Sequence, residues 1–108
     1  MNNNNNKIKV LVVKPFLPVE MVEIENTLKG WQDIVEGYVE SVTLKDGIVV
    51  MCNEEGRLNG LEYCCYIDGI GFVGNIFIAH FDEENLGEIR SLTDKEIVSL
   101  KYGMRIRR

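Results

Sequence analysis

The sequence predicts an α+β domain with an antiparallel or mixed sheet of five to seven strands and two helices. Three observations predict it: several short β-rich runs, Asp-Gly pairs between some of them, and two stretches with helical spacing behind polar capping residues. Short hairpin connections favour antiparallel pairing, and we expect the helices on one side of the sheet. A chain of 108 residues should form one domain around one core.

The first two strands are expected around a proline-containing turn. Residues 7–14 are almost continuously apolar and β-branched, which is typical of a strand buried on both faces. Pro15 and Pro18 end this strand, because proline cannot donate a ladder hydrogen bond. Residues 19–25 nearly alternate apolar with acidic side chains, which predicts a second strand with one wet face, antiparallel to the first.

A helix is predicted next, with Asn26 or Thr27 as its N-cap and Gly37 at its end. Its apolar face would be formed by Leu28, Trp31, Ile34 and Val35. We assign Trp31 to the core.

The middle of the chain is predicted to be hairpins. Residues 38–44 and 48–52 flank Asp46-Gly47, a strong hairpin signal. After a glycine-containing connector, a strand over 61–67 should turn at Asp68-Gly69. The chain would then continue as one long strand over residues 72–81.

The second helix is predicted from a capping box, since Thr93 and Glu96 have the required spacing ahead of an apolar run. Gly103 should close this helix. The domain boundaries that we expect are a disordered Asn-rich leader over 1–6, the folded domain over 7–103 and a basic tail over 104–108.

The charge of the chain is unevenly distributed. The formal net charge is −5, yet the last eight residues carry four basic side chains and no acidic one, so the remainder carries −9. Such a body should repel nucleic acid. No apolar run approaches the roughly 20 residues that span a bilayer, and the N-terminus lacks the pattern of a secretory signal, so we expect the cytoplasm.

The cysteines and the single histidine suggest no metal or catalytic centre. Cys52, Cys64 and Cys65 lack paired zinc-knuckle spacing, and adjacent strand residues should point to opposite faces. They fit buried, reduced thiols. For His80 the sequence assigns neither an orienting carboxylate nor a nucleophile, which favours a structural or surface role. We expect no catalytic residue, no metal and no cofactor.

A binding site is the remaining possibility for the polar residues. Arg57 and Arg90 are the only arginines before the basic tail, and a guanidinium matches phosphate or carboxylate bidentately. A small-molecule pocket also needs a stacking ring and a few convergent donors. The candidate ligand-binding residues are therefore Arg57, Arg90, Asn53, Asn59, Tyr63 and Asn75.

Several segments together resemble a known family. The opening strand KIKVLVVKP, the stretch VEIENTLKGWQDIVEGYVE, NEEGRLNGL and the closing SLTDKEI are similar to domain of unknown function family 3846 over about residues 7–100. The resemblance implies a bacteriophage or mobile genetic element setting in a bacterial host. It implies no catalytic residues.

Three functional hypotheses follow. The first is a non-enzymatic accessory protein that counteracts host defence, for instance by sequestering a nucleotide-derived signalling molecule. The second is a protein-binding antagonist of a host defence enzyme, for which DNA mimicry is disfavoured because the acids are interspersed with lysines. The third is a small phosphodiesterase-like enzyme.

We further expect a homo-oligomer, most simply a two-fold dimer, because a β-rich chain must cover its sheet edges. Residues 72–81 would supply both a core face and a contact face, with Arg57 or Arg90 near the interface. No membrane association and no direct nucleic-acid binding are expected.

Overall fold

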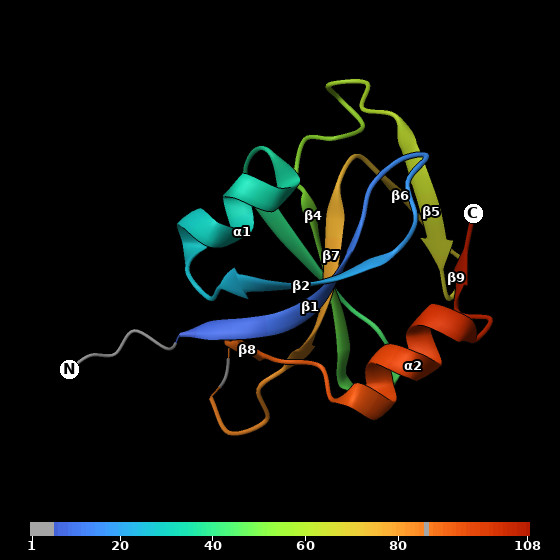
Figure 1. The fold of residues 1–108 in the computed structure, drawn as a ribbon. Helices are drawn as coiled ribbons and strands as arrows, with labels where there is room; N and C mark the ends of the chain where they lie inside the picture. Colours follow the sequence, from blue (N-terminus) through green and yellow to red (C-terminus); the bar gives the residue numbers. More distant parts are fainter. Residues whose placement is uncertain (1–5, 86) are drawn as a thin grey trace.

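The computed structural model describes residues 6–85 and 87–108 and shows an α+β architecture, as predicted (Figure 1). A six-stranded antiparallel sheet has the order β2-β1-β7-β4-β3, with β8 paired to β7. A second sheet has the order β6-β5-β9. The elements are β1 (Lys7–Val13), β2 (Glu20–Glu25), α1 (Leu28–Val35), β3 (Val39–Thr43), a 3-10 turn (Lys45–Gly47), β4 (Ile48–Asn53), β5 (Tyr63–Ile67), β6 (Ile70–Val73), β7 (Ile76–Phe81), β8 (Ile89–Arg90), α2 (Asp94–Tyr102) and β9 (Ile106–Arg107).

The large sheet is covered on both faces, so the molecule has two apolar clusters where we expected one. Val10 and Val12 of β1 point to the cluster beneath α1, whereas Leu11 and Val13 point to the cluster shared with α2 and the second sheet. The two helices therefore lie on opposite faces of the sheet, and the prediction that both lie on one side is wrong. The prediction that β1 is buried on both faces is confirmed.

The helix caps follow the sequence closely. The hydroxyl of Thr27 accepts a hydrogen bond from the Gly30 N–H at 3.0 Å, so Thr27 is the N-cap of α1. Glu36 ends α1 in the left-handed region with a φ of 62°. The next residue, Gly37, has to be a glycine, because a Cβ there would lie 2.5 Å from the side-chain nitrogen of Asn53. The predicted capping box of Thr93 at α2 is present.

The predicted hairpins are confirmed, but the predicted long strand over 72–81 is wrong. Gly74, with a φ of 72°, separates β6 from β7. β6 pairs with β5 in the second sheet, whereas β7 lies between β1 and β4 in the first. β7 is almost wholly buried, so it cannot also supply the contact face that we expected from it.

β5 contains an irregularity that changes where its cysteines point. Tyr63 pairs with Val73 and Cys65 with Phe72, so two residues of β5 oppose one residue of β6. This is the arrangement of a β-bulge. Cys64 and Cys65 are both buried, at 2% and 0% exposure, in the same apolar cluster, and our expectation that they point to opposite faces is wrong.

The two ends of the domain differ from the expected boundaries. Most of the expected leader lies outside the described residues, but the carbonyl oxygen of Asn6 accepts a hydrogen bond from the N–H of Asn26 at 2.7 Å. The expected basic tail contains β9, which pairs with β5. The guanidinium of Arg108 donates to the carbonyl oxygens of Leu17 and Lys14 at 2.6 and 2.9 Å, so residues 104–108 belong to the folded domain.

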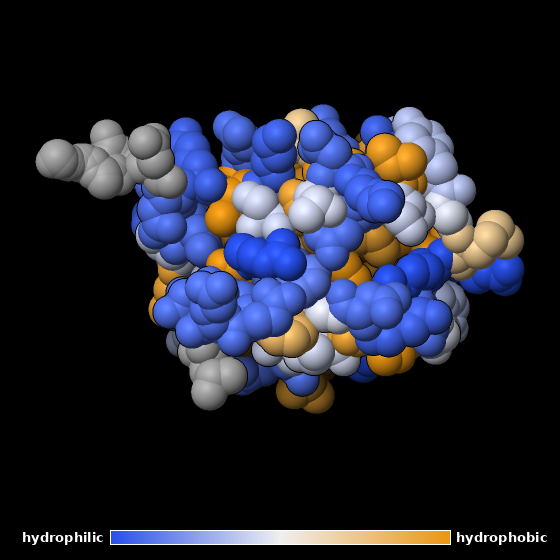
Figure 2. Space-filling view, turned by 90° about the horizontal axis from the view of Figure 1, so that it is seen from below, coloured by the Kyte–Doolittle hydropathy of each residue, from blue (hydrophilic) through white to orange (hydrophobic). Residues whose placement is uncertain are grey.

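The surface around α2 and the β7–β8 loop is mainly hydrophilic in the view from below, with apolar atoms in small separate areas (Figure 2). In the described part of the chain, neither helix has the length and apolar character that crossing a membrane requires.

Candidate functional site

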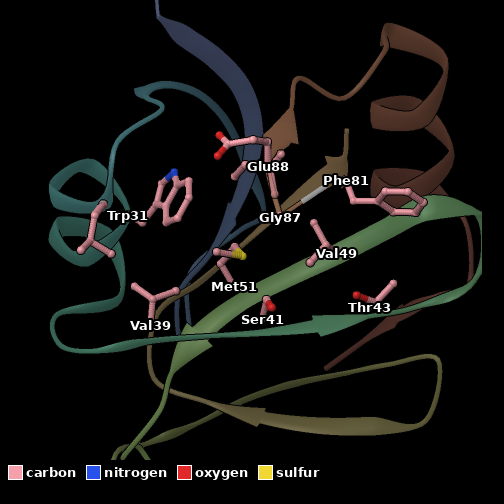
Figure 3. A pocket seen from close by; sticks show the side chains of 11 residues that line it. Trp31, Val39, Ser41, Thr43, Val49, Met51, Phe81, Gly87 and Glu88 are labelled. Atoms are coloured by element: carbon pink, nitrogen blue, oxygen red, sulfur yellow. The ribbon is translucent and has the colours of Figure 1, made fainter. Parts of the chain in front are cut away.

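An open groove of about 480 Å³ lies on the α1 face of the large sheet (Figure 3). It forms because α1, with eight residues, is only about 12 Å long and cannot cover the whole face. Val49 and Met51 of β4 form part of the floor, and Trp31 of α1 stands at one end with Phe81 of β7 toward the other. The groove is lined by Leu28, Trp31, Val39, Ser41, Thr43, Val49, Met51, Phe81, Gly87, Glu88 and Ile89.

The indole of Trp31 is held in place by a specific bond. Its Nε1 donates to the side-chain oxygen of Asn26 at 3.1 Å, and the side-chain nitrogen of Asn26 donates to the carbonyl oxygen of Ile89 at 3.0 Å. These two bonds link the first turn of α1 to β8 across the end of the sheet. The indole of Trp31, which forms one wall of the groove, is therefore held in position by the protein itself.

The polar groups of the groove come from its two sides. Ser41 and Thr43 are exposed residues of β3 and share the groove face with Val39, since alternate strand residues point the same way. Glu88, next to β8, contributes a carboxylate from the opposite side (Figure 3). No arginine, lysine or histidine is among the described residues that line the groove. The site is suited to an apolar ring with hydrogen-bonding edges and unsuited to an anion.

The candidate ligand-binding residues that the sequence singled out do not converge on this groove. Asn53 is 9% exposed, and its side chain donates to the carbonyl oxygens of Val35 and Glu36 at 3.1 and 3.3 Å. It accepts from the N–H of Glu55 at 2.8 Å. These bonds close the C-terminal end of α1, so Asn53 is occupied structurally.

The two candidate arginines lie apart. Arg57 donates to the carbonyl oxygen of Gly71 at 2.8 Å and lines a hollow apart from the groove, together with Glu40, Glu54 and the candidate Asn53. Arg90 belongs to β8, where it donates to the carbonyl oxygen of Ser91 at 2.9 Å. Acidic residues lie near both arginines. Glu40 and Glu54 line the hollow of Arg57, and a carboxylate oxygen of Glu83 lies 3.4 Å from Nε of Arg90. The pair does not form a phosphate clamp.

The other three candidates also lie away from the groove. Asn59 lines a hollow beside the end of α1 that Asn53 also lines. Tyr63 lies on the second sheet, where its hydroxyl donates to the carbonyl oxygen of Arg108 at 3.4 Å. Asn75 is half-buried in the turn between β6 and β7.

Comparison with known proteins identifies the family. The family model for the domain of unknown function DUF3846 matches residues 8–106, nearly the whole chain. The chain belongs to the DUF3846 family. No curated protein and no solved structure matches it.

His80 of this DUF3846 chain is a packed residue on the face opposite the groove. It is 5% exposed, and its Nδ1 lies 2.7 Å from the carbonyl oxygen of Phe81. Its Nε2 lies 3.4 Å from a carboxylate oxygen of Glu96, a neighbour that the sequence did not reveal. A Cβ at Gly47 would lie 2.3 Å from the imidazole, so glycine is required there. Within the described residues, no cluster of three or more metal-ligating side chains accompanies it.

The sequence does not reveal the groove, because the apolar spacing around Trp31 indicates a core residue. Trp31 does pack against the apolar cluster beneath α1, but it is only half-buried. A signal was available in the sequence, because Ser41 and Thr43 alternate with Val42 and so place two hydroxyls on one face of a strand.

Proposed function

We propose that this DUF3846 protein is a non-enzymatic binding protein whose groove at Trp31 holds a small ligand with a flat, uncharged ring. The observation that carries the proposal is the fixed indole above an apolar floor with hydroxyls alongside. A volume of about 480 Å³ falls within the range of small-molecule sites.

The lining defines the chemistry of the ligand. A flat ring can stack on Trp31 with an offset geometry. Its polar edge can exchange hydrogen bonds with the hydroxyls of Ser41 and Thr43, and the carboxylate of Glu88 can accept from an N–H or attract a partial positive charge. A phosphate in the groove would meet Glu88 and no cation. A nucleobase or nucleoside is therefore the preferred occupant, with any phosphates directed outward to water.

In the phage or mobile-element setting that the family resemblance implies, such a ligand would be the base of a nucleotide-derived signalling molecule. Tight binding without turnover would sequester the signal and counteract host defence. A phosphodiesterase-like activity is less well supported, because His80 is buried on the other face of the sheet.

The proposal has a direct optical test, because Trp31 is the single tryptophan of the chain. Nucleosides, cyclic dinucleotides and cyclic ADP-ribose variants are titrated while tryptophan emission and heat of binding are recorded. We expect emission changes with at least one nucleoside or nucleotide. Mass analysis of small molecules released from the purified protein extends the panel. No response from any ring compound, and none released, would contradict the proposal.

A matched pair of variants on β3 assigns the response to the groove. Thr43→Val removes one groove hydroxyl while keeping the shape, and we expect weaker binding by roughly 5-fold to 10-fold, which corresponds to about 1 kcal/mol for one hydrogen bond. Glu40→Gln, on the opposite face of the same strand, should bind as the parent protein does. Equal losses in both variants would place the ligand elsewhere.

A second candidate function, protein binding, is favoured by the turn between β1 and β2. Phe16 is 80% exposed and has a φ of 68°, an unfavourable conformation for a bulky residue. An exposed aromatic ring held in strain suits a docking contact with a host protein. A pull-down from host lysate with parent protein and Phe16→Asn tests this, since a specific partner should be lost with the ring.

DNA mimicry has less support than ordinary protein docking. The longest extent of the molecule is 41 Å, over which duplex DNA presents about 24 charges at one per 1.7 Å. The body without its basic C-terminal segment offers a net −9.

A further inference from the structure

We propose that β3 pairs antiparallel with β3 of a second copy of this chain, in a register centred on Ser41, so that two large sheets join into one. The pairing does not depend on what the groove binds. It follows from the backbone, the charges and the symmetry of this one strand.

The outer edge of β3 has backbone groups available for a partner. The N–H of Leu44 donates to the carbonyl oxygen of Ile48 at 2.7 Å, and the N–H of Glu54 donates to the carbonyl oxygen of Tyr38 at 2.8 Å. Because hydrogen-bonded pairs alternate along an antiparallel ladder, the backbone N–H and C=O groups of the even-numbered residues of β3 are directed toward β4. The N–H and C=O groups of Val39, Ser41 and Thr43 therefore point away from β4. They lie on the outer edge of the sheet, because β3 is the last strand in the order of the large sheet.

The two edges of the large sheet differ in their protection. Strand β2, at the other edge, carries Glu20, Glu23 and Glu25 among its six residues. Charged side chains on an edge strand are a common device against pairing with another chain. Strand β3 carries Glu40 as the one charged residue of its five, so it is the less protected edge.

The sequence of β3 selects one register. When Ser41 lies opposite Ser41 of the second copy, Val39 lies opposite Thr43 and Glu40 lies opposite Val42. Three hydrogen-bonded pairs then exchange about six backbone bonds. A shift that places Val39 opposite Ser41 brings the two Glu40 side chains face to face, and like charges directly opposite destabilise a pair. The Ser41 register is both longer and free of that clash.

The second copy would contribute to the groove. Val39 and Thr43 line it at the β3 edge. In the Ser41 register, paired residues point to the same face, so the partner's Thr43 and Val39 become their neighbours. The two grooves then lie side by side on one face of the joined sheet, each extended by the other copy. On the opposite face, Arg57 lines the hollow that contains Glu40 and can offset the charge of the two Glu40 carboxylates.

Proline substitution tests the edge without disturbing the monomer. The N–H of Ser41 faces outward, so Ser41→Pro removes a bond to the second copy but none to β4. The matched control is Glu23→Pro: the bond from Asn26 N–H to Asn6 places Glu23 at an outward position of β2. By light scattering at micromolar concentration we expect twice the chain mass of 12.3 kDa for the parent and Glu23→Pro, and the single mass for Ser41→Pro.

Circular dichroism and thermal melting of each variant confirm that the monomer is folded. Should Ser41→Pro fail to fold, Ser41→Lys places two cations opposite each other at the axis and tests the same contact. A monomeric parent protein overturns the proposal. So does a dimer that Ser41→Pro and Ser41→Lys leave intact, or a monomer whose β3 edge instead takes up a strand of another protein.

A crosslink tests the register. In a hydrogen-bonded antiparallel pair the Cα atoms of Ser41 and its symmetry mate lie about 5.5 Å apart, within the range of a disulfide. Ser41→Cys should yield an oxidised dimer on a non-reducing gel, and Glu23→Cys should not. The native cysteines do not compete, because all three are buried and burial, with Glu40 nearby, raises the pKa of Cys52 to about 11. Equal crosslinking of both variants overturns the Ser41 register.

Discussion

The side-chain amide of Asn53 donates to the carbonyl oxygen of Val35 at 3.1 Å, so β4 caps the helix that carries Trp31. A polar residue that the sequence marked as a ligand contact thereby holds the groove's helix in place.

Asn53→Ala should lower the free energy of unfolding by about 1–3 kcal/mol, because it leaves buried carbonyl groups without a donor. Asn59→Ala is the matched control, since that residue is exposed, and should change stability by less than about 0.5 kcal/mol. Urea unfolding curves compare the two. Similar effects from both substitutions would show that the cap is energetically unimportant.

The bond between Asn26 and Trp31 should be visible in tryptophan emission. Asn26→Ala removes the acceptor for the indole N–H and the donor to Ile89, and we expect a red shift with a loss of about 1–2 kcal/mol. Asn26→Asp loses the donor but keeps an acceptor, so its emission should stay nearer to that of the parent protein. Identical spectra for all three proteins would mean that Asn26 does not position the ring.

The ion pair between Arg105 and Asp68 should make stability depend on pH. Nitrogen and oxygen lie 2.7 Å apart, and the hydrogen bond from Arg105 lowers the pKa of Asp68 below its ordinary value. A lowered pKa in the folded state gives stability that is present above the unfolded pKa and lost as pH falls through the folded one. Asp68→Asn should therefore cost about 0.5–1 kcal/mol near neutral pH, with the difference shrinking below about pH 4.

Asp46→Asn provides the control for that prediction. Its carboxylate lies 3.5 Å from the same arginine but is 74% exposed, so solvent screening leaves little to lose. Chemical denaturation of the three proteins at several pH values separates the outcomes. A constant gap between parent and Asp68→Asn across the acid range would refute the linkage.

Phe16→Asn should raise stability. The left-handed conformation costs a non-glycine residue about 1–2 kcal/mol, and asparagine tolerates it better than phenylalanine. Because Phe16 is 80% exposed, little packing is lost, and we expect a gain of about 0.5–1 kcal/mol. Leu17→Asn, at a neighbour without positive φ, should give no gain in thermal melting. A destabilised Phe16→Asn would indicate that the ring packs in solution.

The parts of the fold that the sequence predicted are those set by local chemistry. Thr27, Thr93 and the Asp-Gly turns act within a few residues of themselves, and their elements formed where expected. Strand membership depends on distant partners instead. Residues 72–81 have one continuous apolar pattern, yet Gly74 divides them between two sheets because Leu61 packs against that glycine.

The site was less predictable for the same reason. Arg57, Arg90 and Tyr63 are residue types that bind ligands, but residue type does not reveal which side chains meet in space. The groove arises from the shortness of α1 relative to the sheet and from the tie between Asn26 and Ile89, which lie far apart in sequence.

The bulge in β5 acts as a phase shift along that strand. Side chains before and after it are out of step by one residue, which is why Tyr63 and Tyr66 can both face outward although three positions separate them. Deleting one cysteine would restore the regular alternation. Tyr63 would stay outward in that case, but one of the two buried thiols would be lost, such as that of Cys64, which now meets the Val13 carbonyl oxygen at 3.5 Å. The second sheet therefore depends on the number of residues at this point as much as on their identity.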